Sequence, residues 1–143
     1  MAYEHVLMTQ KTFPISMTCA NATGIEKGAV LTLSDLNTAA SSTSGADMVA
    51  GIAYTEKIAG DGNIHISVLA GPGDELRAYA SGTIGVGDPL VTAASPTASN
   101  FNYLSSAKDT ADLSGSVIIG YSKEDATVGE TFKYVLNITS VNK

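Results

Sequence analysis

The sequence is poor in several residue types, and each shortage narrows what the chain can be. Its 143 residues contain one cysteine, no tryptophan and one arginine. A lone cysteine, Cys19, excludes an internal disulfide framework and a cysteine-based zinc site. There are 8 Lys and Arg residues against 14 Asp and Glu, so the formal charge is -6 and nucleic-acid binding is not expected.

Long apolar runs are also missing. No stretch approaches the roughly 18 uninterrupted apolar residues of a spanning helix, so no membrane association is expected. The start, Met1 to His5, lacks the basic segment and the apolar run of a signal peptide. We therefore expect synthesis in the cytoplasm.

Small residues and turn signals are abundant instead, and they occur in two segments that resemble each other. The segments cover about residues 25–70 and 84–139, and each has a Gly-bounded strand, a polar stretch and a closing strand. Two copies are too few for a solenoid, so we expect two similar halves of one small β domain. The paired glycines are Gly28 with Gly87, Gly51 with Gly120, and Gly60 with Gly129.

Alternation of apolar and polar residues predicts the strands. On this basis Phe132, Tyr134 and Leu136 are expected to face the core. The apolar runs 48–53 and 117–121 are typical of strands buried on both faces. The fold class predicted is all-β, a small barrel or sandwich of two similar halves with an extended N-terminal arm and at most one short helix.

Three local predictions accompany this fold. Pro14 cannot donate to a ladder, which predicts an edge position for the strand from Phe13 to Cys19. The segments 34–46 and 92–106 are rich in Ser, Thr and Ala and are expected to be surface loops. The segment 105–113 is the single candidate for a short helix.

The arm covers residues 1–12, ahead of a single β domain at 13–143. It carries four large side chains that are candidates for partner contact: Tyr3, Val6, Leu7 and Met8. The arm is either an additional edge strand or frayed terminus, or a segment that orders by adding a strand to a partner's sheet. The second alternative predicts that deleting residues 2–12 abolishes partner binding and leaves the fold intact.

The sequence shows no set of residues for catalysis, cofactor binding or metal binding. The two histidines, His5 and His65, have no serine or cysteine tied to them, and Cys19 is expected to be a small buried hydrophobe. The run Asp61-Gly62-Asn63 starts like a calcium loop but lacks the glycine and glutamate that such a loop requires, so we expect a hairpin turn. We therefore expect a protein that acts by contact and not as an enzyme.

Four short motifs occur in order along the two halves. They are Lys27-Gly28-Ala29-Val30-Leu31, Gly51-Ile52-Ala53, Gly85-Val86-Gly87-Asp88-Pro89-Leu90 and Ile119-Gly120-Tyr121, and a final strand follows them. This ordered set resembles the head-decoration, or cement, proteins of tailed bacteriophages, over about residues 13 to 141.

The resemblance implies a structural protein of the virion with a small β-barrel or β-tulip-like fold, commonly a homotrimer. Such proteins bind the major capsid protein on the outside of the expanded head, at three-fold or quasi-three-fold positions, and stabilise the shell against internal pressure. The resemblance gives Gly28, Gly51, Gly87 and Gly120 a structural role at turns. A protein that binds only the assembled shell, and not its separate subunits, would stabilise the shell by mass action.

Two other classes remain open from the residues. One is a carbohydrate-binding or adhesin-type β module on a virion or cell surface, supported only by polar loops with Tyr54, Tyr79, Tyr103 and Tyr121. The other is a hydrolase or isomerase whose carboxylate pair is assembled by the fold, which a titrating carboxylate in a deep pocket would reveal.

Overall fold

The structure is a computed structural model of the chain, and it describes residues 3–42, 48–93, 102–107 and 117–140. Within these ranges the chain forms strands and no helix, so the all-β prediction is confirmed. The strands are β1 (Val6–Thr9), β2 (Ile15–Thr18), β3 (Val30–Asp35), β4 (Thr38–Ser41), β5 (Val49–Ala53), β6 (His65–Leu69), β7 (Glu75–Tyr79), β8 (Pro89–Ala93), β9 (Tyr103–Ser106), β10 (Val117–Ser122) and β11 (Thr131–Ser140).

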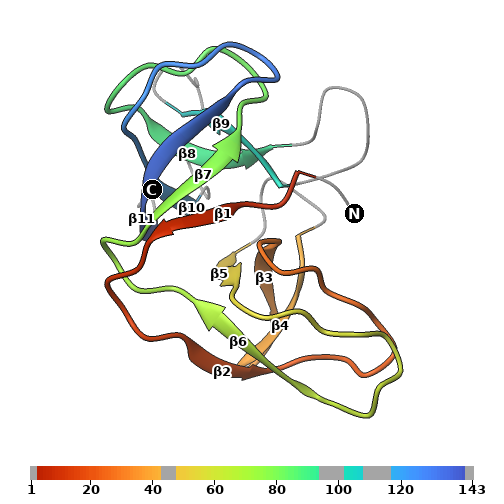
Figure 1. Cartoon of the computed structure of the whole chain (residues 1–143). Coiled ribbons are helices and arrows are strands. Elements are labelled where there is room, and N and C mark those ends of the chain that lie inside the picture. Colours follow the sequence, from red (N-terminus) through yellow and green to blue (C-terminus); the bar gives the residue numbers. More distant parts are fainter. Residues whose placement is uncertain (1–2, 43–47, 94–101, 108–116, 141–143) are drawn as a thin grey trace.

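The strands form a closed barrel and a second, six-stranded sheet (Figure 1). The barrel has the order β2-β4-β3-β5-β6, and a parallel pairing of Thr18 with Thr38 joins β2 to β4. The six-stranded sheet has the order β1-β7-β11-β10-β8-β9. An isolated parallel bridge between Ala80 and Leu104 brings the ends of β7 and β9 together in the same way.

The two sheets share one topology. Read from its first strand, the barrel runs β2-β6-β5-β3-β4, and the other sheet runs β7-β11-β10-β8-β9. The correspondence includes β2 and β7, which precede the segments compared in the sequence. β1 has no counterpart, since it is an additional strand on the outer edge of β7.

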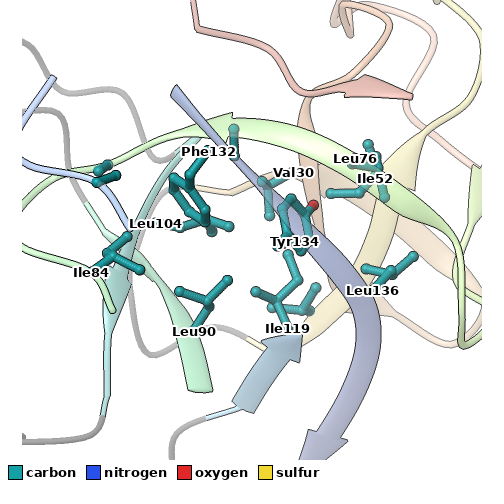
Figure 2. Close-up of a cluster of buried hydrophobic side chains, with 14 of the residues drawn as sticks. Val30, Ile52, Leu76, Ile84, Leu90, Leu104, Ile119, Phe132, Tyr134 and Leu136 are labelled. Atoms are coloured by element: carbon teal, nitrogen blue, oxygen red, sulfur yellow. The ribbon is translucent and has the colours of Figure 1, made fainter. Parts of the chain in front are cut away.

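The hydrophobic core has two parts. One lies inside the barrel and combines small side chains, such as Cys19 and Ala39, with larger aliphatic ones, such as Leu31. The other lies where the barrel meets the six-stranded sheet, and Val30 and Ile52 of the barrel pack there with side chains of β7, β10 and β11 (Figure 2). The second cluster therefore binds the two sheets into one packed body.

Alternation predicted the longest strand correctly. Phe132, Tyr134 and Leu136 of β11 are fully buried, and the labelled close-up shows them turned into the shared core (Figure 2). β5 is buried on both faces as predicted, because Ala50 and Ala53 face the barrel interior whereas Val49 and Ile52 face the shared core.

The polar segments contain strands that the sequence did not predict. The segment 34–46 was expected to be a surface loop, yet β4 lies within it and buries Ala39. In segment 92–106, β8 continues to Ala93 and β9 begins at Tyr103. The helix prediction for 105–113 is wrong where it can be compared, since Ser105 and Ser106 belong to β9, and residues 108–113 lie outside the described ranges.

The edge position predicted for β2 is also wrong. β2 pairs with β6 on one side and with β4 on the other. Pro14 directly precedes the strand, so its missing N–H removes no ladder bond. Of the alternating apolar row, Met17 and Cys19 are buried, whereas Phe13 and Ile15 are exposed.

Candidate interaction site

The N-terminal arm forms β1 and completes the six-stranded sheet of its own chain. β1 runs antiparallel to β7, with Val6 opposite Arg77 and Leu7 opposite Leu76. Successive side chains alternate between the two faces, so Leu7 packs against the shared core while Val6 and Met8 point outward. Of the two alternatives for the arm, the structure shows the additional edge strand.

Tyr3 fixes the start of the arm. Its ring makes edge-to-face contacts with Tyr79 and Tyr103, at centroid distances of 5.0 and 4.8 Å. The backbone of Tyr3 is left-handed, with φ at 67°. Such aromatic pairs each stabilise by about 1 kcal/mol beyond the area that they bury. Tyr3 and Leu7 therefore hold the arm in place, and the outward contact candidates are Val6 and Met8.

A buried carboxylate, Asp74, fixes the other end of the arm. Its Oδ1 accepts the backbone N–H groups of Lys11 and Thr12, and its Oδ2 accepts the Thr12 hydroxyl at 2.5 Å. Asp74 itself is fully buried just ahead of β7. Because one side chain satisfies three donors of the linker between β1 and β2, the arm is part of the folded body.

His5 connects the arm to both sheets. Its N–H donates to the Gly28 carbonyl of the barrel at 2.8 Å. In the side chain, Nε2 lies 2.7 Å from the Asn102 carbonyl and Nδ1 lies 2.6 Å from the Tyr134 hydroxyl. A carbonyl can only accept, so Nε2 carries the proton and Nδ1 accepts from Tyr134. Asn102 continues the network, since its Oδ1 accepts the N–H of Val30.

Burial determines the protonation of this network. The pKa of His5 is lowered to about 4, because burial removes water from the charged imidazolium, although the bond to Asn102 opposes the shift. The pKa of Tyr134 is raised well above its ordinary value, also by burial. Both groups are therefore neutral at pH 7, and the network serves as a structural connection.

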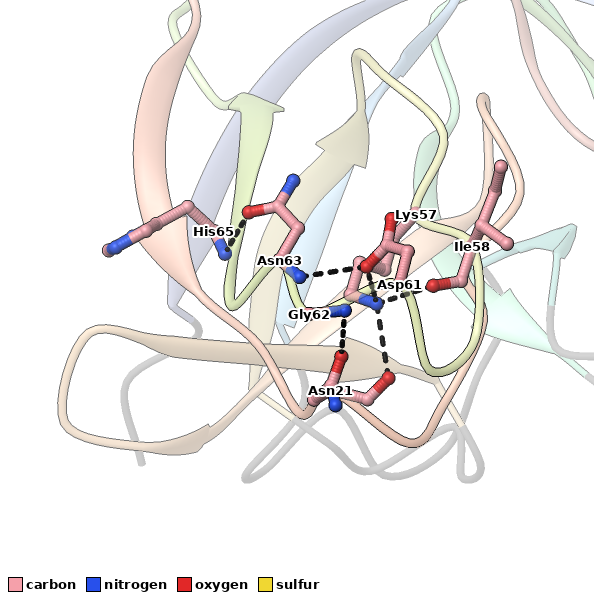
Figure 3. Close-up of polar contacts among 7 residues, drawn as sticks. All are labelled: Asn21, Lys57, Ile58, Asp61, Gly62, Asn63 and His65. Carbon is pink, nitrogen blue, oxygen red and sulfur yellow. Dashed lines mark hydrogen bonds and ion pairs between the residues drawn. The ribbon is translucent and has the colours of Figure 1, made fainter.

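A second polar cluster surrounds Lys57 in the barrel half (Figure 3). The side chain of Lys57 is fully buried, and its ammonium donates to the Asn21 carbonyl at 3.1 Å, the Ile58 carbonyl at 2.5 Å and Asp61 Oδ1 at 2.7 Å. The bond from Lys57 lowers the pKa of Asp61. The Asp61 turn, predicted as a hairpin turn, is thus organised around an ammonium of the chain itself.

Charged residues lie on the outer face of the six-stranded sheet, next to Val6. Glu75 pairs with Lys123 at 2.7 Å, and Arg77 pairs with Glu124 at 3.2 Å. The bond from Lys123 lowers the pKa of Glu75, and the N–H of Lys133 lowers that of Glu124. Exposed pairs of this kind add little stability, so this face is a solvated, charged surface bordered by the arm.

The four glycines predicted at turns divide into two kinds. Gly28 and Gly87 occupy equivalent turns with φ values of 90° and 84°, where a side chain is disfavoured. Gly51 and Gly120 lie within β5 and β10, not at turns, and a Cβ at Gly120 would overlap the Val135 carbonyl. Their shared requirement is close backbone approach across the ladder.

The cysteine and the second histidine of the chain lie in different surroundings. Cys19 is buried, as predicted, and burial raises the pKa of its thiol. His65 is exposed on β6. Among the described residues, no three His, Cys, Asp or Glu side chains are placed to hold a metal ion. The same ranges contain no helix long and apolar enough to cross a membrane.

The four tyrosines of the carbohydrate alternative do not share one surface. Tyr54 in the barrel donates to Gln10 Oε1 at 3.1 Å. Tyr79 and Tyr103 pack against the ring of Tyr3, whereas Tyr121 is exposed on β10. Nothing in this arrangement forms the flat aromatic platform that a sugar ring would stack on.

The chain has the same fold as a solved protein structure. The chain superimposes on the head fiber gp8.5 N base of bacteriophage phi29 with a TM-score of 0.55, at 16% sequence identity, covering 91% of this chain and 98% of that one. The two chains share a fold. No protein-family model and no curated protein sequence matches the chain.

Proposed function

We propose that this chain is a structural protein of a tailed-phage head, and specifically a decoration or cement protein. It binds the outside of the expanded shell as a homotrimer at three-fold or quasi-three-fold positions, and it stabilises the shell against internal pressure. The observation that carries the proposal is the fold shared with a phage head fiber base over nearly the whole of both chains. The order of turn and strand motifs along the sequence supports it.

A role through contact also agrees with the chemistry of the described residues. The buried side chains of His5 and Asp74 are engaged in holding the arm and the sheets together. A trimer that touches several coat subunits gains avidity from modest individual contacts. Contact-based stabilisation of a lattice needs no catalytic group.

We place the shell contact on the outward face of the arm. Val6 and Met8 are 58% and 50% exposed on a strand that is otherwise fixed by buried partners. Such a pre-ordered apolar pair loses little conformational entropy on binding. The major capsid protein is the partner proposed, and the virion surface is the proposed location.

The direct test is co-sedimentation of the purified protein with expanded and unexpanded shells from its own source. Saturable binding to expanded shells at a fixed ratio to coat protein supports the proposal, and light scattering of the free protein tests the trimer. Failure to bind either form of the shell contradicts a decoration role.

The arm contact needs a substitution and not a deletion. Removing residues 2–12 would remove His5 and also Lys11 and Thr12, which donate to Asp74. We therefore expect the deletion to disturb the fold, in contrast to the expectation from the sequence. The double variant Val6→Ser, Met8→Ser should bind shells at least tenfold more weakly at unchanged stability, because it removes only exposed apolar surface. Leu36→Ser, at a 91% exposed site on the β3–β4 turn, is the matched control.

A further inference from the structure

The Lys57 turn has a counterpart in the second half of the chain. In the barrel half, Ile25 and Lys57 exchange two backbone hydrogen bonds of 2.9 and 2.8 Å. In the second half, Ile84 and Ala126 exchange the same two bonds, at 2.8 and 2.9 Å. Both pairs are isolated antiparallel bridges. Ala126 therefore stands at the position that Lys57 occupies in the first half.

The acceptors that hold the Lys57 ammonium have counterparts as well. The Asn21 carbonyl accepts the N–H of Gly60, and the Ala80 carbonyl accepts the N–H of Gly129 in the same way. Asp61 lies four residues after Lys57, and Glu130 lies four residues after Ala126.

The third acceptor follows the same pattern. The N–H of Asp61 donates to the Ile58 carbonyl, and the N–H of Glu130 donates to the Thr127 carbonyl. The second half thus repeats two backbone carbonyls and one carboxylate around the site of the ammonium, and it has a methyl group where the lysine side chain begins.

A pocket of about 290 Å³ lies at this position. Ile84, Ala126, Thr127 and Glu130 line it, together with Asp125. Glu130 Oε1 accepts the N–H and the hydroxyl of Thr127, which fixes the carboxylate in the turn. Within the described part of the chain, no Lys, Arg or His forms an ion pair with Asp125 or Glu130.

We propose that this pocket binds a lysine side chain of the major capsid protein. The ammonium would be held by the Thr127 carbonyl and the Glu130 carboxylate, which are equivalent to two of the three groups that hold Lys57 in the first half. The choice of partner rests on the proposed function. A charge-assisted bond of this kind is about twice as strong as a neutral one.

The charge distribution favours a basic partner over a second copy of this chain. Of the six Lys and Arg residues that the structure describes, four already form ion pairs: Lys57, Arg77, Lys123 and Lys133. The chain as a whole carries a charge of -6. A lysine from an oppositely charged surface would be attracted to the pocket.

The first test grafts the first-half lysine into the second half. Ala126→Lys should fold with the introduced ammonium shielded from water beside Glu130, as seen by crystallography. The ratio of folded to unfolded protein should be about tenfold higher for Ala126→Lys than for Ala126→Met, which carries similar bulk without the charge. Adding Glu130→Gln should remove that difference. An introduced side chain that points into solvent, or a difference that is independent of Glu130, overturns the pocket chemistry.

The second test uses shells and needs no buried substitution. Glu130→Gln keeps an oxygen for Thr127 and removes the charge, so it should weaken shell binding about tenfold at unchanged stability. Glu56→Gln, at an exposed carboxylate beside Lys57 in the barrel half, is the matched control. If the natural chain binds shells and Glu130→Gln binds equally well, the pocket proposal fails and the decoration role stands. If the natural chain does not bind shells, both the decoration role and the proposed binding of a capsid lysine fail. The Ala126→Lys variant then still decides whether the pocket holds an ammonium group.

Discussion

Acidification should destabilise the fold through one buried histidine, His5. Its pKa is about 4 in the folded chain against an ordinary value near 6.5. The unfolded chain therefore binds a proton at a pH where the folded chain does not, and stability is lost as the pH falls from about 6.5 toward 4. Each pH unit between the two values is worth about 1.4 kcal/mol, so the free energy of unfolding should fall by about 2 kcal/mol between pH 7 and pH 5.

Surface carboxylates contribute a separate change below this window. The pKa values of Asp61, Glu75, Glu124 and Glu130 are lowered by their hydrogen bonds. Their stabilisation is present above their ordinary pKa values and is lost only as the pH falls through the lowered ones. The interval from pH 7 to pH 5 therefore isolates the histidine.

The assay is urea unfolding at half-unit steps of pH, with two matched variants. His5→Gln should lower stability at pH 7 and flatten the dependence on pH between 7 and 5. His65→Gln, at the exposed histidine on β6, should leave both nearly unchanged. A natural chain that is equally stable at pH 7 and pH 5, or a His5→Gln variant that keeps the full slope, would refute the reasoning.

Three further substitutions test the contacts of the arm, each by urea or thermal unfolding. Gly28→Ala should lower the free energy of unfolding clearly more than Gly87→Ala. At both turns alanine would have to adopt a positive φ, which costs about 1 kcal/mol, but only at Gly28 would the new methyl group also overlap the arm; equal losses of stability would contradict the docking of β1. Asp74→Ala should cost about 2–3 kcal/mol, since it leaves three linker donors without their buried acceptor; a loss below 1 kcal/mol would speak against that anchor. Tyr134→Phe should cost about 1–2 kcal/mol, because the buried imidazole loses the donor to its Nδ1; an unchanged midpoint would contradict the assigned tautomer.

Local alternation allowed the strands with large side chains to be predicted. Phe132, Tyr134 and Leu136 form a period-two row, and the all-β class follows from such rows and from frequent turns. β4 gave no such signal, because its residues Thr38 to Ser41 are all small and include no large apolar side chain. At β4 the barrel interior takes the methyl group of Ala39, so this part of the sequence looks like a loop.

The polar network of the arm could not be predicted for a different reason. His5 and Tyr134 are 129 positions apart, and neither residue carries a local pattern that points to the other. Lys57 is a similar case, since a lysine in a turn is ordinarily exposed. The sequence did contain one signal for Lys57, the similarity of its two halves, because Lys57 and Ala126 occupy equivalent positions in them.

The short, irregular edge of the six-stranded sheet has a consequence for how the protein behaves at high concentration. β1 is four residues long, and its register with β7 shifts between Leu7 and Thr9. Long, flat edges invite other chains to add strands without limit, and a bulge on a short edge opposes this. The barrel, closed through Thr18 and Thr38, offers no such edge. The edge that β1 presents is therefore a poor template for edge-to-edge aggregation.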